Sequence, residues 1–271
     1  MSFTRVDDLV ANGLGIYQVI AKDSGTAKAA GQAHTPWYQT GIIPAGAAPT
    51  GGLAGNLIIG TVAGQIPIPA AVASTTVRMT RLALTQTGNI GNVWVIDKNW
   101  GNVPVVTTTG SQAVVSPNWS NRDASGSTNG AKIYLALECS AATGNAGAIT
   151  NTTVSYTNSA GTSGRTATLS SWPITAVAGT WQMFSLQAGD DGVRSVQSIT
   201  LGTSYISGQV HLVAFRLVAE LATPNTNVAN VAGFANLGMP TVWDSSVLQL
   251  VYWPTGTALG AVAGSCSWAQ G

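Results

Sequence analysis

The chain has 271 residues, of which only 8% are charged, eleven Lys or Arg and ten Asp or Glu, and its formal net charge is +1. A folded monomer of this size would expose about 11,000 Å², so its charges would be spread at about one per 500 Å², roughly a third of the usual density. This composition excludes the basic surface that binds nucleic acids or anionic membranes, and it leaves little repulsion between copies. We therefore predict a protein that sits permanently against other subunits, including other copies of itself.

Turn-forming and apolar residues together predict a β protein. The chain is 45% hydrophobic and contains 32 Gly and 11 Pro, a profile typical of short strands joined by many turns. We expect a mainly β fold, a jelly-roll-like antiparallel β-sandwich with extended N-terminal and C-terminal arms. Its expected parts are a short helix and extended arm over residues 1–75, the sandwich over residues 76–221, and C-terminal strands with an arm over residues 222–271.

The first residues favour one short helix over residues 4–12. Thr4 suits its N-cap, Asp7 and Asp8 lie in its first turn, and Gly13 follows its end. The same two acids stand where the apolar core of a secretion signal would begin. We therefore expect no such signal and synthesis in a cytoplasm.

Residues 13–75 predict an extended arm. Apolar side chains recur there without a helical or strand period, and Pro and Gly interrupt them every few positions. A free loop of this length is unusual inside a compact domain, so we expect the arm to lie over another surface. The longest uncharged run, residues 29–77, contains five prolines, which excludes a membrane-spanning helix.

Alternating apolar residues predict strands from residue 75 onward. The expected strands of the sandwich lie at residues 77–84, 93–96, 133–137, 154–156, 166–169, 181–186, 193–201 and 211–217. Residues 158–161, Asn-Ser-Ala-Gly, predict a hairpin turn between the fourth and fifth of them. Residues 242–243 and 247–253 predict two further strands, and the neutral sequence from Pro254 onward predicts a terminal arm.

Residues that bind metals are scarce. His34 and His211 are the only histidines, and their spacing to the cysteines matches no zinc motif. His211 lies within a strand pattern, so we interpret it as a structural or surface histidine. Cys139 and Cys266 are 127 positions apart; buried free thiols are favoured, and a disulfide between them stays open. We expect no metal and no cofactor.

The acidic residues offer two weak catalytic or metal-binding hypotheses. Glu138 and Glu220 are the only glutamates available for glycoside chemistry, and we interpret Glu138 as a solvent-facing carboxylate at the end of an apolar strand. Asp190 and Asp191 stand between two glycines and could hold Ca²⁺ with loop carbonyls, although a tight turn is favoured. The chain also lacks a nucleophile elbow and a phosphate loop, so we predict that it is not an enzyme.

Tryptophan is the one abundant residue that could bind a ligand, with nine copies. Trp100 and Trp119 stand beside Gly, Asn and Ser in expected loops, where an exposed ring could stack on a sugar. Tryptophan also anchors cores and protein interfaces. We favour core or interface roles and keep Trp100 and Trp119 as the candidate sugar-binding residues.

Several strand-and-turn segments resemble those of structural proteins of tailed-bacteriophage virions. These segments are residues 37–46, 93–97, 154–161, 188–196 and 208–217. The resemblance implies a β-sandwich that coats a capsid or forms part of a tail, located in the virion, without catalytic residues. It also implies as partners the major capsid protein or other virion proteins, besides other copies of the chain, with a trimer as one expected assembly.

The expected function is therefore a capsid-associated coat or cement subunit that stabilises a shell. Two alternatives stay open. One is a glycan-binding module on a tail or capsid surface, which would use Trp100 and Trp119; the other is a glycan-degrading tail enzyme, which would use Glu138 and Glu220. If residues 1–75 are an arm, their deletion should abolish particle binding and leave the sandwich folded.

Overall fold

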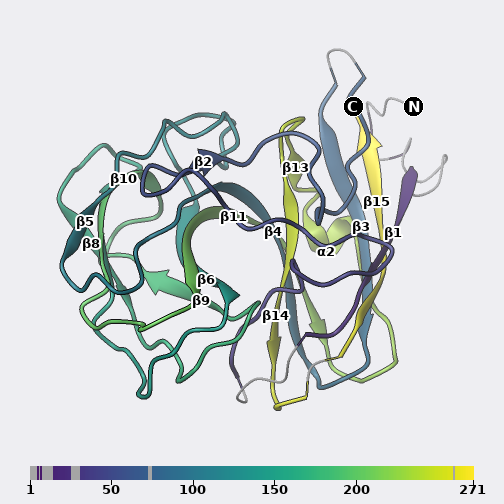
Figure 1. Cartoon of the computed structure of the whole chain (residues 1–271). Helices are drawn as coiled ribbons and strands as arrows, with labels where there is room; N and C mark the ends of the chain where they lie inside the picture. Colours follow the sequence, from purple (N-terminus) through teal and green to yellow (C-terminus); the bar gives the residue numbers. More distant parts are fainter. Residues whose placement is uncertain (1–4, 6, 8–14, 26–30, 73–74, 259) are drawn as a thin grey trace.

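The computed structural model describes residues 5, 7, 15–25, 31–72, 75–258 and 260–271. Its regular secondary structure is nearly all β, with antiparallel sheets in a sandwich-like arrangement (Figure 1), which confirms the mainly β fold. The described helix α2 spans only Phe234–Leu237. No helix in the described ranges is long and apolar enough to cross a membrane. The helix expected at residues 4–12 falls, apart from Arg5 and Asp7, outside the described residues.

The smaller sheet joins the two ends of the chain. Its order is β1 (Ile16–Lys22), β15 (Val262–Gln270), β3 (Val77–Gln86) and β12 (Asn230–Gly233), and β13 (Thr241–Val242) also pairs with β3. β15 is paired on both sides, with β1 and with β3. The terminal arm expected from Pro254 onward is therefore wrong, because this segment fills the gap between two strands of its own chain.

The larger sheet has ten strands and contains most of those expected from the sequence. In sheet order they are β14 (Leu248–Pro254), β4 (Gly91–Gly101), β11 (Gln209–Thr223), β6 (Ile133–Ala141), β9 (Trp181–Ser185), β8 (Arg165–Leu169), β7 (Thr153–Asn158), β10 (Val193–Thr200) and β5 (Ser111–Ala113), with β2 (Asn56–Leu57) on β4. The predicted hairpin is confirmed: β7 and β8 pair antiparallel, and the amide of Gly161 donates to the carbonyl of Asn158 at 2.9 Å.

Part of the larger sheet closes into a barrel through the N-terminal segment. His34 forms antiparallel bridges to both Tyr252 of β14 and Thr180 just before β9. Its amide donates to the Tyr252 carbonyl at 2.9 Å, and the amide of Trp181 donates to the carbonyl of Ala33 at 3.0 Å. Residues 33–35 therefore complete a ring with β14, β4, β11, β6 and β9, which we call the closed barrel.

This closure changes the interpretation of the N-terminal arm. Residues 31–43 lie over the chain's own sheets, and both Trp37 and Ile43 are buried there. β1 adds a strand to the smaller sheet. The expected arm was correct in being extended and lying over a surface, but that surface belongs to the same chain.

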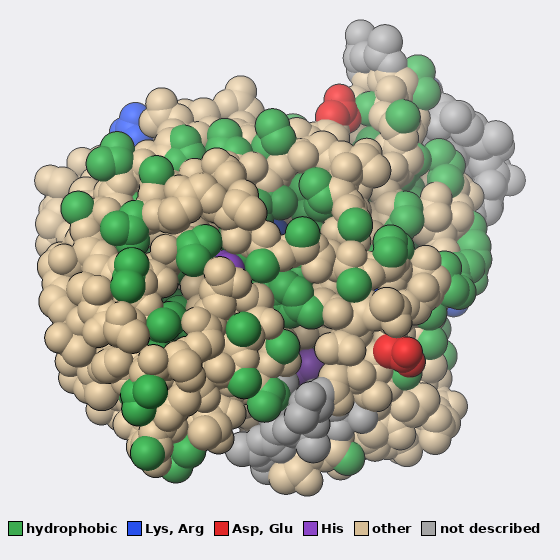
Figure 2. Space-filling view, in the orientation of Figure 1, with side chains coloured by type: hydrophobic (Ala, Val, Ile, Leu, Met, Phe, Trp, Pro, Cys, Tyr) green, Lys and Arg blue, Asp and Glu red, His purple; other side chains and the backbone are tan. Residues whose placement is uncertain are grey.

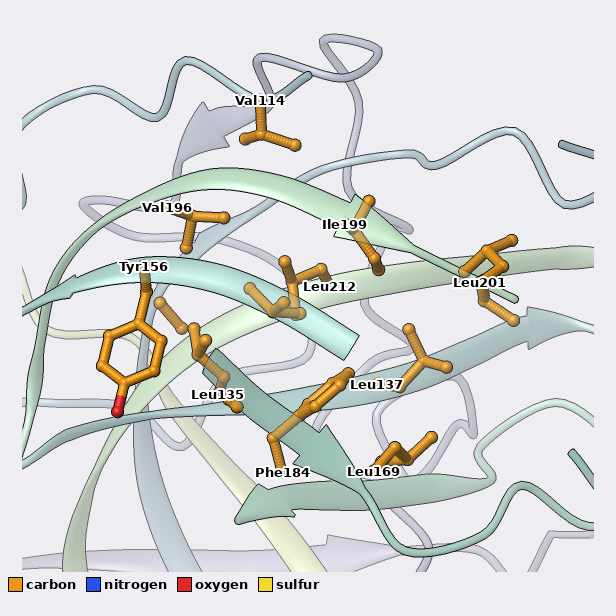
Figure 3. Close-up of a cluster of buried hydrophobic side chains, with 14 of the residues drawn as sticks. Val114, Leu135, Leu137, Tyr156, Leu169, Phe184, Val196, Ile199, Leu201 and Leu212 are labelled. Carbon is orange, nitrogen blue, oxygen red and sulfur yellow. The ribbon is translucent and has the colours of Figure 1, made fainter. Parts of the chain in front are cut away.

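Three large hydrophobic cores lie among the described residues. The largest lies where β6, β7, β8, β9, β10 and β11 curl around one another (Figure 3). The second lies between the smaller sheet and β4, β11 and β14, and the third fills the closed barrel. β11 contributes to all three, through Leu212, Leu221 and Val213 respectively. β11 is thus buried on both of its faces, which explains why its sequence is almost continuously apolar.

Candidate functional site

Two adjacent residues of β4 organise the charged interior of the molecule. Side chains of consecutive strand residues point to opposite faces of the sheet, so Lys98 enters the closed barrel while Asp97 points away from it. Both side chains are fully buried. Each one is the centre of a cluster of polar groups.

The inner cluster surrounds Glu138. Lys98 donates from Nζ to Glu138 Oε1 at 2.7 Å, and the hydroxyl of Tyr38 donates to the same oxygen at 2.6 Å. Gln249 donates from Nε2 to Glu138 Oε2 and to Thr35 Oγ1, both at 2.8 Å. The cluster thus links β4, β6 and β14 to the N-terminal segment, and the interpretation of Glu138 as solvent-facing is wrong. That segment covers this end of the barrel, so the carboxylate is buried.

Electrostatics keep the Glu138 carboxylate charged. Burial alone would raise its pKa, but the charge of Lys98 and the hydrogen bonds from Lys98, Tyr38 and Gln249 together lower it. The pKa of Tyr38 is raised well above its usual value, chiefly by burial and also by the neighbouring carboxylate. Lys98 also lies over the ring of Trp37, with Nζ 5.0 Å from the ring centroid. The inner cluster is therefore a satisfied ion pair at neutral pH, without a proton ready for transfer.

The outer cluster surrounds Asp97. Its carboxylate accepts hydrogen bonds from Ser246 Oγ at 2.6 Å and from the amide of Val247 at 3.0 Å. The guanidinium groups of Arg122 and Arg216 approach it to 3.4 and 3.7 Å. Burial lowers the pKa of both arginines, and the charge of Asp97 opposes that shift.

Arg122 ties loops to β4 through its whole guanidinium group. It donates to Asn99 Oδ1 at 3.0 Å, to the carbonyl of Ile58 at 2.7 Å and to the carbonyl of Ser245. Asn99 is available to accept this hydrogen bond because it is the extra residue at the point where the register between β4 and β11 shifts. The outer cluster therefore holds two loops against one strand.

The sequence allowed either a structural or a surface role for His211. The structure shows the structural role, because the ring is buried beside the inner cluster. Its Nε2 is 2.7 Å from Ser140 Oγ, and its Nδ1 is 3.0 Å from the carbonyl oxygen of Asn102. Burial lowers its pKa to about 4, against an opposing influence of Glu138. The ring is thus neutral at physiological pH.

The candidate sugar-binding residues lie in the largest core. Trp100 is 0% and Trp119 is 1% exposed, and their ring centroids are 5.7 Å apart. Their indole N–H groups donate to the carbonyls of Ala54 and Val193. The expectation that these two rings stand in exposed loops is wrong, since β4 extends through Trp100 and the chain around Trp119 folds back over the core.

The acidic pair is held by hydrogen-bond donors. Gly189 has φ +88° and stands in a turn, as favoured from the sequence. Asp190 accepts from Tyr156, Asn158 and Arg165 at 2.5 to 2.8 Å, and these bonds, that of Arg165 first, lower its pKa to about 2. No group of three or more metal-ligating side chains gathers among the described residues.

Both cysteines are buried thiols that form no disulfide with each other, which confirms the favoured interpretation. Cys139 belongs to the largest core and Cys266 to the second. Burial raises the pKa of Cys266 to about 12, so this thiol is poorly nucleophilic.

Two hollows lie near the N-terminal segment. One, of about 270 Å³, is mainly apolar and is lined by Trp37, Gly101 and residues 47–50, 56–59 and 62–63. The other, of about 340 Å³, is more polar and includes Asp244 and Ser246. Neither hollow is lined by Lys98 or Glu138. The ion pair of Lys98 and Glu138 is therefore not part of the lining of either hollow.

The sequence reasoning missed the two charged clusters. A usable signal was present, because Asp97-Lys98-Asn99 interrupts an otherwise apolar strand, and charged residues are rarely buried unless they are paired. The partners of these residues are far away in sequence, and only the fold brings them together. No known protein family, curated protein or solved structure matches the chain.

Proposed function

We propose that the chain is a structural subunit of a protein shell, and more specifically a capsid-associated coat or cement subunit of a tailed-bacteriophage virion. The role as a shell subunit rests on the scarcity of charge on the protein surface. The more specific role as a virion subunit rests on the resemblance of the chain's strand-and-turn segments to such proteins. Its partners would be other copies of the chain and the major capsid protein or another virion protein.

The observation that carries this proposal is the scarcity of surface charge. Seven charged side chains are buried: Lys22, Asp97, Lys98, Arg122, Asp123, Glu138 and Arg216. At most fourteen of the 21 charges are then left for a surface of 10522 Å², about one per 750 Å², which is about a fifth of the ordinary density. Figure 2 shows one face on which red and blue side chains are few. A surface of this kind is suited to permanent contact with other subunits.

The interior chemistry supports a mechanical role. Every charged group of the inner cluster is satisfied and buried, and it joins strands that are distant in sequence. The glycan-binding alternative loses both of its named residues to the core, since Trp100 and Trp119 have no free ring face. The enzymatic alternative loses Glu138, which is paired with Lys98 inside the barrel.

The test is the solution mass of the full chain, measured by light scattering alone and with shells assembled without it. We expect a stable oligomer that docks onto the shells and makes them more resistant to heat. A matched measurement uses an unrelated shell of similar size as a control for nonspecific adhesion. A chain that stays monomeric and ignores its own shells would overturn the proposal.

A further inference from the structure

The smaller sheet ends at β1, and no strand of the described residues pairs with the outer side of β1. β1 is the outermost strand at the right of Figure 1, and its inner side is paired with β15 from Ile16–Trp268 to Lys22–Val262. An open strand edge presents unpaired N–H and C=O groups, which makes it a template for pairing with another strand.

The backbone bonds of neighbouring residues show which groups of β1 face outward. The carbonyl of Ala21 accepts from the amide of Ile43 at 3.2 Å, and the amide of Asp23 donates to the carbonyl of Thr40 at 2.7 Å. In an antiparallel ladder alternate residues face the same side, so Tyr17 and Val19 also turn their backbone groups outward. Across the described chain no hydrogen bond reaches those groups of Tyr17 and Val19.

The edge lacks the devices that usually protect it. Edge strands are normally blocked by Pro, by a bulge or by an outward-pointing charge, often Lys. β1 has neither Pro nor a register shift. Its only charged residue, Lys22, is buried, and its Nζ donates to the carbonyls of Gln39 and Pro44 at 2.9 and 2.6 Å. The exposed residues are apolar instead: Tyr17 is 58% and Val19 is 44% exposed.

We propose that β1 pairs antiparallel with β1 of a second copy of the chain, around a two-fold axis at Gln18. In that register Tyr17 lies opposite Val19 of the partner subunit, and Val19 lies opposite the partner subunit's Tyr17. Each of these two pairs exchanges two backbone hydrogen bonds, and each places an aromatic side chain beside a β-branched one. The same strand thus supplies both halves of the contact, as an isologous interface requires.

A second copy fits this edge better than a charged partner does. The free part of β1, residues 16–20, carries no charge, so its complement is a neutral apolar strand, which is what the second copy presents. Ile42, next to the Ile43 amide that bonds to the carbonyl of Ala21, is a further exposed apolar residue in the segment beside this strand, at 68% exposure. The inference deepens the proposed function and rests on it, because it assigns one contact through which the subunits would assemble.

The experiment compares the full chain with Val19→Lys and with Val115→Lys as the matched control. Val115 is 82% exposed and follows the end of β5, a strand of the larger sheet. Sedimentation velocity over a range of concentrations gives the dimerisation constant, and circular dichroism checks folding. We expect dimerisation at least tenfold weaker in Val19→Lys and unchanged in Val115→Lys. Hydrogen exchange adds a backbone readout: the amides of Tyr17 and Val19 should be protected in the dimer and lose protection on dilution.

The outcomes separate this inference from the proposed function. If the chain assembles or docks onto shells while Val19→Lys behaves like the parent and both amides exchange freely, the β1 pairing is wrong and the proposed function stands. If the chain is monomeric and also ignores its shells, both are wrong. Should Val19→Lys fail to fold, the exchange rates of the unmodified chain alone decide whether the edge is paired.

Discussion

The hydroxyl of Tyr38 donates to the carboxylate of Glu138 at 2.6 Å, although 100 positions separate the two residues. This bond connects the N-terminal segment to the interior of the closed barrel. Lys98, the charged partner of Glu138, comes from a different strand. The segment is therefore part of the fold's closure, and it supplies one of the hydrogen bonds that lower the pKa of Glu138.

Replacing Tyr38 with Phe removes one hydrogen bond to a buried charge and preserves the ring. We expect the free energy of unfolding to fall by about 1.5–3 kcal/mol, the usual worth of a hydrogen bond to a charged group. Urea denaturation gives this value, with Tyr17→Phe as the control, since the Tyr17 side chain is exposed and the loss of its hydroxyl should cost less than about 0.5 kcal/mol. Equal effects of the two variants would contradict the role of Tyr38.

Replacing Lys98 with Met leaves Glu138 buried without its counter-charge. We expect a loss of about 3–5 kcal/mol, as for other broken buried ion pairs. Adding Glu138→Gln removes the stranded charge and keeps an acceptor for Tyr38, so the double variant should recover much of the loss.

The comparison for this pair is Lys132→Met. Lys132 and Asp191 form an ion pair at 3.3 Å with both side chains more than half exposed, so this change should cost at most about 1 kcal/mol. Denaturation of the parent, Lys98→Met, Glu138→Gln and the double variant gives the coupling energy by a double-mutant cycle. If the Lys98 and Lys132 variants lose similar stability, the inner cluster does not hold the barrel as described.

The buried His211 predicts a pH dependence of stability. Its pKa is about 4 in the folded chain against an ordinary 6.5, so the unfolded chain binds more protons between these two values. Stability from this group is therefore fully present above about pH 6.5 and is lost as the pH falls toward 4, by up to about 3 kcal/mol in total.

Thermal unfolding at intervals between pH 7 and pH 4 measures this loss. His211→Gln should flatten the pH profile in that window. Asp190 does not interfere, because its bond to Arg165 and its other donors lower its pKa from 3.8 to about 2, so its effect on stability falls below pH 4. A His211→Gln profile as steep as that of the parent would show that another group titrates there.

Deletion of residues 1–75 tests whether the N-terminal region is an arm or part of the fold. The structure predicts that the remaining chain loses cooperative unfolding, because the deletion removes β1 from the smaller sheet and the bridges that His34 makes to β14 and β9. Calorimetry and circular dichroism of residues 76–271 provide the measurement. A sharp transition near that of the full chain would restore the earlier idea of a detachable arm.

Local patterns predicted much of the sheet. The alternation around Leu135 and Leu137 defines the faces of β6, and the turn residues after Tyr156 define the hairpin of β7 and β8, because side-chain period and turn chemistry act between near neighbours. The candidate site was not predictable in this way. Trp100 and Trp119 resemble loop residues by their neighbours, and Glu138 resembles an exposed strand end, whereas burial depends on which distant segment covers them.

The sequence by itself determined that the chain is a β protein with few charges to place on its surface, since composition and alternation are properties of the chain alone. Only the tertiary structure decided where those few charges went. Asp97 and Lys98 are neighbours in β4, yet their partners Arg216 and Glu138 lie on other strands. The physical reason is that a buried charge must be paired, and the residue that pairs with it is selected by the packing of strands rather than by distance along the chain.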